Sequence, residues 1–359
     1  MIKVLHFVSK MDRGGQETFI MNVYRNLNRN KIQFNFLCSE NVVGDYDNEI
    51  ANLGGKIFYL PSLRVNKGVR KYLQKIYDIS SWLKNNREKF DIVHLHTYHA
   101  LDVYVHLKAF KLANVNKVII HSHNTQGLHV LLHKFFRKWN NLFFKFTPLA
   151  CSKEAGIWLY NKENVEIIYN GIDIDNFRFD QSKRQLLKKQ LGLTNEVVLG
   201  HVGRFNYQKN HEFLIKVFER YHEINPNSIL LLIGKGEKES DIKKMVDDRK
   251  LTKYVRFLGT CSNVNEYLSV FDIFVFPSLF EGLSVVLVEA QVNGLKILAN
   301  KNTTSDAIIS DNVDLLRLDE NEWVEVIKKT NFARTNNINF NKFDISQTAK
   351  RMENIYLQI

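Results

Sequence analysis

Short runs of β-branched and aromatic residues alternate along the chain with longer segments in which apolar residues recur every three or four positions. The first pattern predicts buried strands and the second predicts amphipathic helices, so their alternation favours parallel βαβ units. Residues 16–27 are typical of the helical segments, with four apolar side chains on one predicted face: Phe19, Ile20, Val23 and Leu27. In the first half we predict strands at 2–9, 34–40, 56–60, 91–97, 117–124, 148–152 and 165–171.

The same alternation begins again after residue 180, which indicates a second domain. A chain of 359 residues also exceeds what one hydrophobic core usually supports. Asn170 and Gly171 form a turn signal, so we place the linker at 170–180. The strands predicted after the linker are 196–203, 228–236, 254–260, 273–278 and 295–300. The expected organisation is an N-terminal domain, 1–170, a C-terminal domain, 171–340, and a helix in 341–359 that packs back on one domain, with the N-terminal domain as our prediction.

The composition is ordinary for a globular protein, with 45% hydrophobic and 25% charged residues. No apolar run reaches the ~18 residues of a membrane span, and the N-terminus turns polar too soon for a secretory signal, so we expect a cytoplasmic protein. The net charge of +12 favours anionic partners: nucleic acid, acidic lipid or phosphorylated small molecules. The three cysteines are far apart, which excludes a Cys-x-x-Cys zinc motif and fits reduced structural thiols.

We therefore expect an α/β fold of two doubly wound, Rossmann-like domains facing across a cleft, with ligands beyond the carboxyl ends of the strands. Gly14 and Gly15 lie between the first strand and a helix, where backbone amides can approach an anion, although a plain turn is an equally good interpretation. Gly234 and Gly236 follow a strand of the second domain. The dinucleotide fingerprint is incomplete there, and no phosphate-loop motif occurs in the sequence.

Arg204 and Lys209 come directly after a predicted buried strand and before a helix. A guanidinium fork and a mobile ammonium suit a diphosphate, whereas a solvated loop is the alternative when the two are taken alone. They follow a strand of the same predicted sheet as Glu281 and Glu289. This shared position favours ligand binding.

Glu281 and Glu289 stand in an otherwise apolar stretch. Carboxylates avoid such surroundings unless they are paired, hydrogen-bonded or facing a ligand. We predict a loop at 280–282 and a short buried helix over 284–293, with Gly294 beyond its C-terminal end. Both carboxylates would then reach one ligand. The alternative is that the helical segment is a strand and that Glu289 pairs with a lysine.

Alternation directs His94 and His96 to one sheet face, and likewise His121 and His123. We do not expect a metal site there, because no aspartate cluster accompanies the histidines and a histidine in a strand is more often structural. His123 lies nearest the end of its strand. It is therefore the better candidate for touching a ligand.

These motifs together resemble the family-four retaining glycosyltransferases of GT-B architecture, close to bacterial capsule and exopolysaccharide enzymes. The resemblance spans nearly the whole chain. Its most specific element is FPSLFEGLSVVLVEA, which holds the Glu-x7-Glu pattern of the family, with an arginine and a lysine upstream at the expected distance. Other matching segments are the Gly14-Gly15 loop, IIHSHNT, ACS, YNGID, VGRFNYQKN and IGKGE.

The resemblance implies retaining transfer of a hexosyl-type sugar from a nucleotide-diphosphate donor, most often UDP. The acceptor would be a saccharide or a polyprenyl-diphosphate-linked saccharide in surface polysaccharide biosynthesis, bound by the N-terminal domain. It also implies neither cofactor nor metal, because Arg204 and Lys209 would hold the diphosphate in place of a divalent ion.

By the same resemblance, Glu289 binds the ribose hydroxyls, and Glu281 lies against the transferred sugar as an orienting and stabilising group. The rest of the donor site is expected at Gly234, Gly236, Gly282 and Leu283.

His123 would face the sugar from the N-terminal domain, and Gly14 and Gly15 would form an acceptor or phosphate loop. The implied catalytic set is Glu281, His123, Arg204 and Lys209. Ser284 stands where the family often has proline, a departure that bears on donor specificity.

Residues 131–146 mix four cations with large apolar residues in a helical pattern, among them Phe135, Phe136, Trp139, Leu142 and Phe143. A basic amphipathic helix of this kind lies on anionic membranes, so we expect peripheral attachment to the inner face of the cell membrane through Leu131–Phe146. The alternative is that its aromatic side chains pack on the sheet while its cations are solvated.

Two other functions fit the same scaffold: a non-catalytic accessory subunit and a sugar-nucleotide epimerase. An accessory subunit would be expected to lose Arg204, Lys209 or the glutamates, and all of them are present. Nucleic-acid binding rests on charge alone, and we do not expect it.

Overall fold

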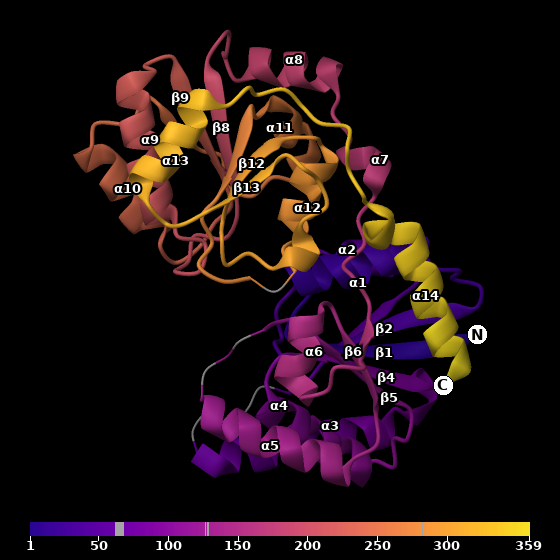
Figure 1. Ribbon diagram of the computed structural model, residues 1–359. Helices are drawn as coiled ribbons and strands as arrows, with labels where there is room; N and C mark the ends of the chain where they lie inside the picture. The colour runs from indigo at the N-terminus through magenta and orange to yellow at the C-terminus, as the bar shows by residue number, and fades with distance from the viewer. Residues whose placement is uncertain (62–67, 126, 128, 282) are drawn as a thin grey trace. The chain divides into compact units, whose positions relative to one another are not determined.

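The structure is a computed structural model, and it describes residues 1–61, 68–125, 127, 129–281 and 283–359 (Figure 1). The chain divides into two compact units. The N-terminal unit comprises Met1–Ile172 and Lys342–Ile359, and the C-terminal unit comprises Asp173–Asn341.

The N-terminal unit is built on a seven-stranded sheet of order β3-β2-β1-β4-β5-β6-β7, with parallel pairing throughout. The strand order reverses between β1 and β4, which is where doubly wound sheets open to ligands. Its strands are β1 (Ile2–Val8), β2 (Ile32–Cys38), β3 (Lys56–Tyr59), β4 (Ile92–Thr97), β5 (Val118–Ser122), β6 (Thr147–Ala150) and β7 (Glu166–Ile167).

Helices cover this sheet, and α1 shows why they form. Its apolar residues Phe19, Ile20 and Val23 are buried in the core beneath it, as their spacing predicted. The helices of the unit are α1 (Gly15–Asn26), α2 (Asp47–Asn52), α3 (Gly68–Asn85), α4 (Ala100–Leu112), α5 (Val130–Phe143), α6 (Lys153–Tyr160) and α14 (Ile345–Gln358), with the short 3-10 turns η1 (Arg87–Lys89) and η3 (Asn341–Phe343).

The C-terminal helix α14 belongs to the N-terminal unit, although it follows the whole C-terminal unit in sequence. It packs on α1 and buries Ile345, Met352 and Tyr356. The Tyr356 hydroxyl also lies 2.8 Å from Nδ1 of His94 on β4. The last residues of the chain thereby complete the core of the unit that the first residues begin.

The C-terminal unit repeats the architecture with a six-stranded parallel sheet of order β10-β9-β8-β11-β12-β13. Here the strand order reverses between β8 and β11. Its strands are β8 (Val197–Val202), β9 (Ser228–Ile233), β10 (Val255–Phe257), β11 (Ile273–Phe276), β12 (Lys296–Asn300) and β13 (Val313–Leu316). Its helices are α7 (Ile174–Phe177), α8 (Gln181–Gln190), α9 (His211–Ile224), α10 (Glu239–Asp248), α11 (Val264–Val270), α12 (Val285–Val292) and α13 (Glu320–Lys329), with the 3-10 turn η2 (Ser305–Ala307).

The two doubly wound parallel sheets confirm the predicted fold class, and every predicted strand overlaps an observed one. The segment after β11 is the helix α12, followed by Gly294 with a φ of +78°, so the strand alternative is wrong. β13 was not predicted. It is a short edge strand whose Asp314 interrupts the apolar run.

Among the residues that the structure describes, no helix is both long and apolar enough to cross a membrane.

The central strand β8 contains a glycine whose replacement tests the packing of the C-terminal unit. A Cβ added at Gly200 would lie 2.1 Å from the ring of Phe271, which is fully buried. We expect Gly200→Ala to lower the free energy of unfolding by about 3 kcal/mol, because overpacking forces the core to shift. Urea unfolding followed by circular dichroism measures this change.

Gly15→Ala is the matched control, since a Cβ there would meet no atom within 4 Å. Its unfolding free energy should stay within about 0.5 kcal/mol of the unmodified protein. Equal losses in the two variants would contradict the tight packing at β8.

Candidate active site

The loop after β8, residues 203–210, carries Arg204 and Lys209 and is fastened to the loop after β9. The backbone N–H of Phe205 donates to the carbonyl of Lys235 at 3.1 Å, and the N–H of Lys238 donates to the carbonyl of Phe205 at 2.9 Å. These hydrogen bonds to the loop after β9 therefore help to fix the backbone of the loop that carries Arg204 and Lys209.

Gly234 and Gly236 let these two loops approach each other. A Cβ at Gly234 would lie 2.0 Å from the carbonyl oxygen of Gly203, and one at Gly236 would lie 2.3 Å from that of Phe205. Gly234 also has a φ of +140°, which L side chains rarely adopt. The close packing of Gly234 and Gly236 against the loop that carries Arg204 is therefore sufficient to explain why both residues are glycine.

Lys209 and Glu281 form the central ion pair of the C-terminal unit. The Lys209 Nζ lies 2.6 Å from Oε1 of Glu281, and the two side chains are only 14% and 11% exposed. The ammonium also lies 5.0 Å from the ring centre of Phe276 at the end of β11. A largely desolvated pair of this kind is costly for folding and depends on both partners.

The loop that carries Glu281 is tied to the Lys209 loop by amide groups. The N–H of Leu279 donates to the carbonyl of Gln208 at 2.8 Å, and Nε2 of Gln208 donates to the carbonyl of Phe280 at 2.8 Å. Asn300, at the end of β12, donates to the carbonyl of Ser278 at 2.9 Å. We did not predict from the sequence that Gln208 and Asn300 belong to this site. Both are polar residues at or beyond the end of a buried strand, and this position could have identified them.

Glu289 lies on α12, in its second turn, as predicted. Burial raises the pKa of its carboxyl to about 8. Among the described residues, nothing forms a hydrogen bond or an ion pair with this carboxyl group, so the predicted lysine partner of the strand alternative is absent. Leu283, just before the helix, is buried, and Gly282 lies outside the described residues.

Arg204 differs from Lys209 in its surroundings. Its side chain is 70% exposed and lies 3.2 Å from Glu237, which is itself 60% exposed. The structure thus brings Lys209 and Glu281 into contact, whereas Arg204 pairs with a different acid on a neighbouring loop.

His123 belongs to the N-terminal unit and follows β5. Its Nε2 lies 2.8 Å from Nδ1 of His96, and its ring lies 5.6 Å from that of Phe19 on α1. Burial lowers the pKa of His123 to about 3, so the ring is uncharged at neutral pH.

Gly14 caps the N-terminus of α1, and Gly15 is the first residue of that helix. A Cβ on Gly14 would lie 2.3 Å from a carboxylate oxygen of Glu17, so this side chain already lies at the helix N-terminus. Burial raises the pKa of Glu17 to about 7. The sequence reasoning missed Glu17, for which the signal was an acid at the third position of a helix that begins with glycine.

A cavity of about 570 Å³ opens in the N-terminal unit at the carboxyl ends of β1 and β4. Its lining includes a lysine–aspartate pair, in which Lys75 Nζ lies 2.8 Å from Oδ1 of Asp102. The hydroxyl of Thr97 donates to the other carboxylate oxygen at 3.1 Å. Lys71, Tyr72, His96, Tyr98, His99, His129 and Leu132 also line the cavity.

The helix α5 buries polar side chains and exposes apolar ones, the reverse of ordinary surface helices. Its buried residues are His133 and Asn140, which bond to the backbone of Ala100. The alternative in which its aromatic residues pack on the sheet is therefore wrong for Phe135 and Trp139, which are 59% and 41% exposed. The exposed apolar residues of α3 and α5, which we call the α3/α5 face, are Val69, Tyr72, Leu73, Tyr77, Val130, Leu131, Leu132, Phe135, Trp139, Leu142 and Phe143.

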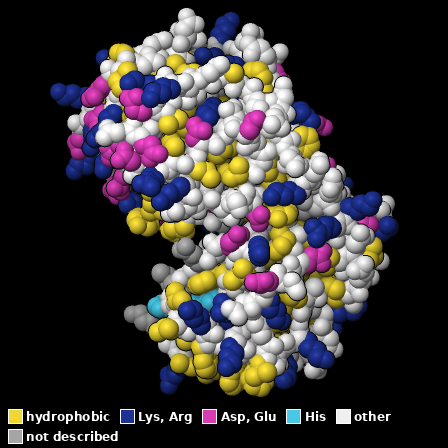
Figure 2. All heavy atoms as spheres, in the orientation of Figure 1, with side chains coloured by type: hydrophobic (Ala, Val, Ile, Leu, Met, Phe, Trp, Pro, Cys, Tyr) yellow, Lys and Arg dark blue, Asp and Glu magenta, His cyan; other side chains and the backbone are white. Residues whose placement is uncertain are grey.

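Lysine and arginine side chains are interspersed with this face, as Figure 2 shows over α3 and α5. Both helices contact α4, so they flank it. Tyr72 and Leu132 belong both to the face and to the cavity lining. The cavity therefore opens beside the exposed apolar surface.

A second cavity, of about 680 Å³, lies elsewhere in the C-terminal unit and is lined in part by Arg184 and Arg334. Arg334 donates to the carbonyls of Leu268, Ser269 and Phe271, so its donors are used within the fold. We do not assign this cavity to the active site.

Two doubly wound units with ionisable side chains at their strand ends define the chain as a GT-B protein. Residues 13–176 match the family model described as Glycosyltransferase Family 4, and residues 183–351 match the model described as Glycosyl transferases group 1. The chain belongs to this family, which is a retaining family of glycosyltransferases that use nucleotide-sugar donors.

Three named relatives align with almost all of the chain. It is 34% identical to the putative glycosyltransferase EpsF of Bacillus subtilis (strain 168), over 99% of this chain and 96% of the relative. It is 28% identical to the capsular polysaccharide biosynthesis glycosyltransferase CapH of Staphylococcus aureus, over 99% of each. It is 26% identical to the UDP-Gal:alpha-D-GlcNAc-diphosphoundecaprenol alpha-1,3-galactosyltransferase of Escherichia coli, over 100% of this chain and 97% of the relative.

Solved structures share the fold. Anabaena Alr3699/HepE in complex with UDP-glucose superposes with a TM-score of 0.81 and 18% identity, over 100% of both chains.

Glu289 generates a prediction about stability and pH. Its carboxyl keeps a proton in the folded protein up to pH 8, whereas the unfolded chain releases it near its ordinary pKa of 4.5. The folded state therefore binds more protons across this window, and stability falls as pH rises. We expect Glu289→Gln to lie within about 1 kcal/mol of the unmodified protein at pH 5 and to exceed its unfolding free energy by about 4 kcal/mol at pH 8.

Urea unfolding at both pH values measures this difference. Glu281→Gln is the control, because it leaves the Lys209 ammonium without its anionic partner and should be destabilising at both pH values. A Glu289→Gln variant that loses stability at pH 8 would contradict the desolvated state of this carboxyl.

Proposed function

We propose that the protein transfers a sugar, with retention, from a UDP-sugar to a polyprenyl-diphosphate-linked saccharide during the synthesis of a surface polysaccharide. The observation that carries this proposal is the contact between Lys209 and Glu281 at the strand ends of the C-terminal unit, 2.6 Å long and largely buried. The named functions of the relatives CapH and the E. coli galactosyltransferase support this choice of pathway. The choice of UDP follows from the same transferase and from HepE.

Lys209 and Arg204 neutralise the donor diphosphate in this proposal. Departure of the nucleotide places negative charge on the diphosphate, and fixed cations at that point lower the barrier. Lys209 is already desolvated, so its attraction to an incoming phosphate is weakly screened. Arg204 is exposed, and its one acidic partner among the described residues is itself exposed, which leaves it able to swing onto the diphosphate. We infer that these two cations act in place of a divalent metal ion.

Glu289 binds the ribose of the donor. Its carboxylate is desolvated and has no hydrogen-bond partner among the described residues, so the donors it needs are the two vicinal hydroxyls of a ribose. Binding of those hydroxyls favours the ionised form and lowers the raised pKa. The α12 N-terminus, with Leu283 before it, adds backbone amides near the phosphates.

Glu281 lies against the transferred sugar and orients it. A carboxylate that is already paired with an ammonium at 2.6 Å is a weaker nucleophile and a better electrostatic stabiliser of a cationic sugar ring. We therefore infer front-face transfer, in which the leaving diphosphate accepts the proton of the acceptor hydroxyl. His123 contributes a sugar contact from the N-terminal unit, and Gly14 and Gly15 border the acceptor or phosphate site.

The acceptor binds in the cavity of the N-terminal unit. Lys71 and Lys75 supply cations for an acceptor diphosphate, and Tyr98 supplies an aromatic surface for a sugar. The polyprenyl tail leaves the cavity past Tyr72 and Leu132 onto the α3/α5 face. We propose that this face lies on an anionic membrane at the cytoplasmic side, since it joins exposed apolar side chains to lysines and arginines.

Nucleotide binding gives the most economical test. UDP is expected to raise the melting temperature more than GDP or ADP, and Arg204→Ala and Lys209→Ala are each expected to remove the shift. Glu281→Ala should still bind UDP but lose transfer, because its role concerns the sugar. A thermal-shift plate with the three nucleotides makes the comparison, and stabilisation by none of them would end the proposal.

Membrane binding is tested with vesicles. We expect cosedimentation with phosphatidylglycerol vesicles and little with phosphatidylcholine vesicles. The double variant Leu131→Glu, Leu142→Glu changes two α5 residues that are 83% and 70% exposed and should weaken binding about tenfold. Leu186→Glu on α8, where the leucine is 61% exposed, is the control and should bind normally. Equal vesicle binding by the α5 double variant and Leu186→Glu would show that α5 does not contact the membrane.

A further inference from the structure

Five histidines meet in the core of the N-terminal unit, on three adjacent strands. His6 belongs to β1, His94 and His96 to β4, and His121 to β5, with His123 just beyond it. The register places His6 beside His94 and His96 beside His121. The proposed chemistry uses only His123, so the buried members of this cluster have no role yet.

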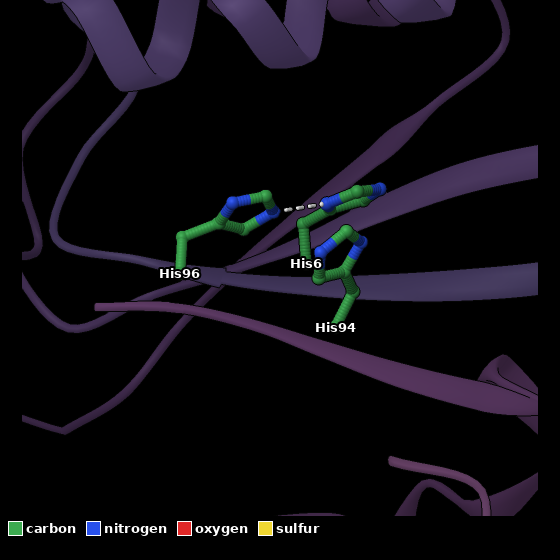
Figure 3. A group of neighbouring side chains, drawn as sticks. All are labelled: His6, His94 and His96. Carbon is green, nitrogen blue, oxygen red and sulfur yellow. Dashed lines mark hydrogen bonds between the residues drawn. The ribbon is translucent and has the colours of Figure 1, made fainter. Parts of the chain in front are cut away.

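Three of these rings form a hydrogen-bonded line, which we call the histidine chain: His6, His96 and His123. Nδ1 of His6 lies 2.9 Å from Nε2 of His96, a contact drawn in Figure 3. Nδ1 of His96 lies 2.8 Å from Nε2 of His123. Both ring nitrogens of His96 are thus engaged: Nε2 contacts His6 in the core, and Nδ1 contacts His123, which we propose faces the ligand.

A metal ion fits these rings poorly. A ring nitrogen binds a metal in the plane of its ring, but the rings of His94 and His96 are stacked face to face at 4.1 Å and 24°. Rings stacked in this way cannot direct their lone pairs at one point between them. The nitrogen pairs of the histidine chain are also at hydrogen-bond distance already.

The histidines of the chain are uncharged, because burial lowers the pKa of His6 and of His123 to about 3 and that of His96 well below its ordinary value. A neutral imidazole has one N–H and one lone pair. His96 must therefore donate to one neighbour and accept from the other. The tautomers of all three rings are consequently set together.

The buried end of the chain decides the direction of donation. If donation runs inward from His123, Nε2 of His6 carries a hydrogen, whereas outward donation leaves a lone pair there. That nitrogen is buried and has no hydrogen-bond partner among the described residues. A buried N–H without an acceptor is rarer than an under-used acceptor, so outward donation from His6 to His123 is favoured.

We propose that His6 and His96 are positioning residues that hold His123 in one tautomer, with a bare Nε2 and with its Nδ1–H directed away from the histidine chain. The consequence for catalysis rests on the proposed function: this N–H donates to an oxygen atom of the transferred sugar. The tautomer itself is a property of the free protein and does not depend on that function.

Nitrogen NMR of protein labelled at its imidazole nitrogens tests the tautomer, because protonated and bare ring nitrogens have well-separated shifts. We expect His123 to show a protonated Nδ1 and a bare Nε2. Two other histidines provide internal references with opposite tautomers. Nδ1 of His133 accepts from the N–H of Ala100 at 3.2 Å, whereas Nδ1 of His201 donates to the carbonyl of Val275 at 2.7 Å.

His96→Asn and His96→Phe form a matched pair of variants. Asparagine places an amide nitrogen where imidazole has Nδ1, so it retains the donation to His123. Phenylalanine retains a ring and removes the donor. We expect the His123 signals of His96→Asn to match those of the unmodified protein, and those of His96→Phe to lose the single Nδ1–H form. If His96→Phe fails to fold, the unmodified protein and His96→Asn still decide the tautomer.

The link to function is tested by adding UDP-glucose, UDP-galactose or UDP-N-acetylglucosamine. At least one should shift the Nδ1 resonance of His123 in the unmodified protein and in His96→Asn. If none does while the tautomer is as expected, the proposed sugar contact fails and the histidine chain stands.

Two results would overturn the inference. The first is a His123 with a bare Nδ1 and a protonated Nε2, or a His123 signal that is unchanged in His96→Phe. The second is a stoichiometric divalent ion in the purified protein that is lost in His96→Phe, since a metal would then occupy the place of the hydrogen bonds.

Discussion

The contact between Lys209 and Glu281 is the interaction on which the proposed active site depends. Two charges have been largely removed from water there, and the 2.6 Å contact between them offsets part of the desolvation cost of each. The contact joins the loop after β8 to the loop after β11, at the point where the strand order of the sheet reverses. The amide contacts of Gln208 hold those two loops together, and the close approach at Gly234 holds the loop after β8 against the loop after β9. In the function that we propose, the backbone thereby fixes the cation before a phosphate binds, so little reorganisation is needed at the moment of reaction.

Other features of the molecule also oppose simple folding preferences, and they concentrate where we propose ligands. Glu289 is a desolvated acid without a partner among the described residues, and the histidine chain places polar rings in a core that apolar residues would fill more favourably. The helix α5 turns its apolar side chains outward. Local departures of this kind are expected at functional sites, because binding a ligand or a membrane supplies the partners that the folded chain alone lacks.

The sequence predicted the elements well, because parallel strands buried on both faces have a strong apolar signature. It also placed Glu281, Glu289 and Lys209 beyond strand ends, where the structure has them. What it missed depends on three-dimensional detail. The edge strand β13 is too short and too polar to stand out. The alternation of His94 and His96 indicated a shared face but not that His6, far away in sequence, lies at hydrogen-bond distance from His96. The inward face of α5 was hidden because its buried residues are polar: His133 and Asn140 bond to the backbone of Ala100, and His133 also to that of Trp158.

A crystal structure of the complex with UDP is the most direct measurement of whether protein cations neutralise the donor. Our interpretation requires the diphosphate to lie beside the loop after β8, with the Lys209 Nζ within about 3 Å of a phosphate oxygen and the ribose hydroxyls on the carboxylate of Glu289. A UDP molecule bound elsewhere, with Lys209 still engaged only by Glu281, would contradict it.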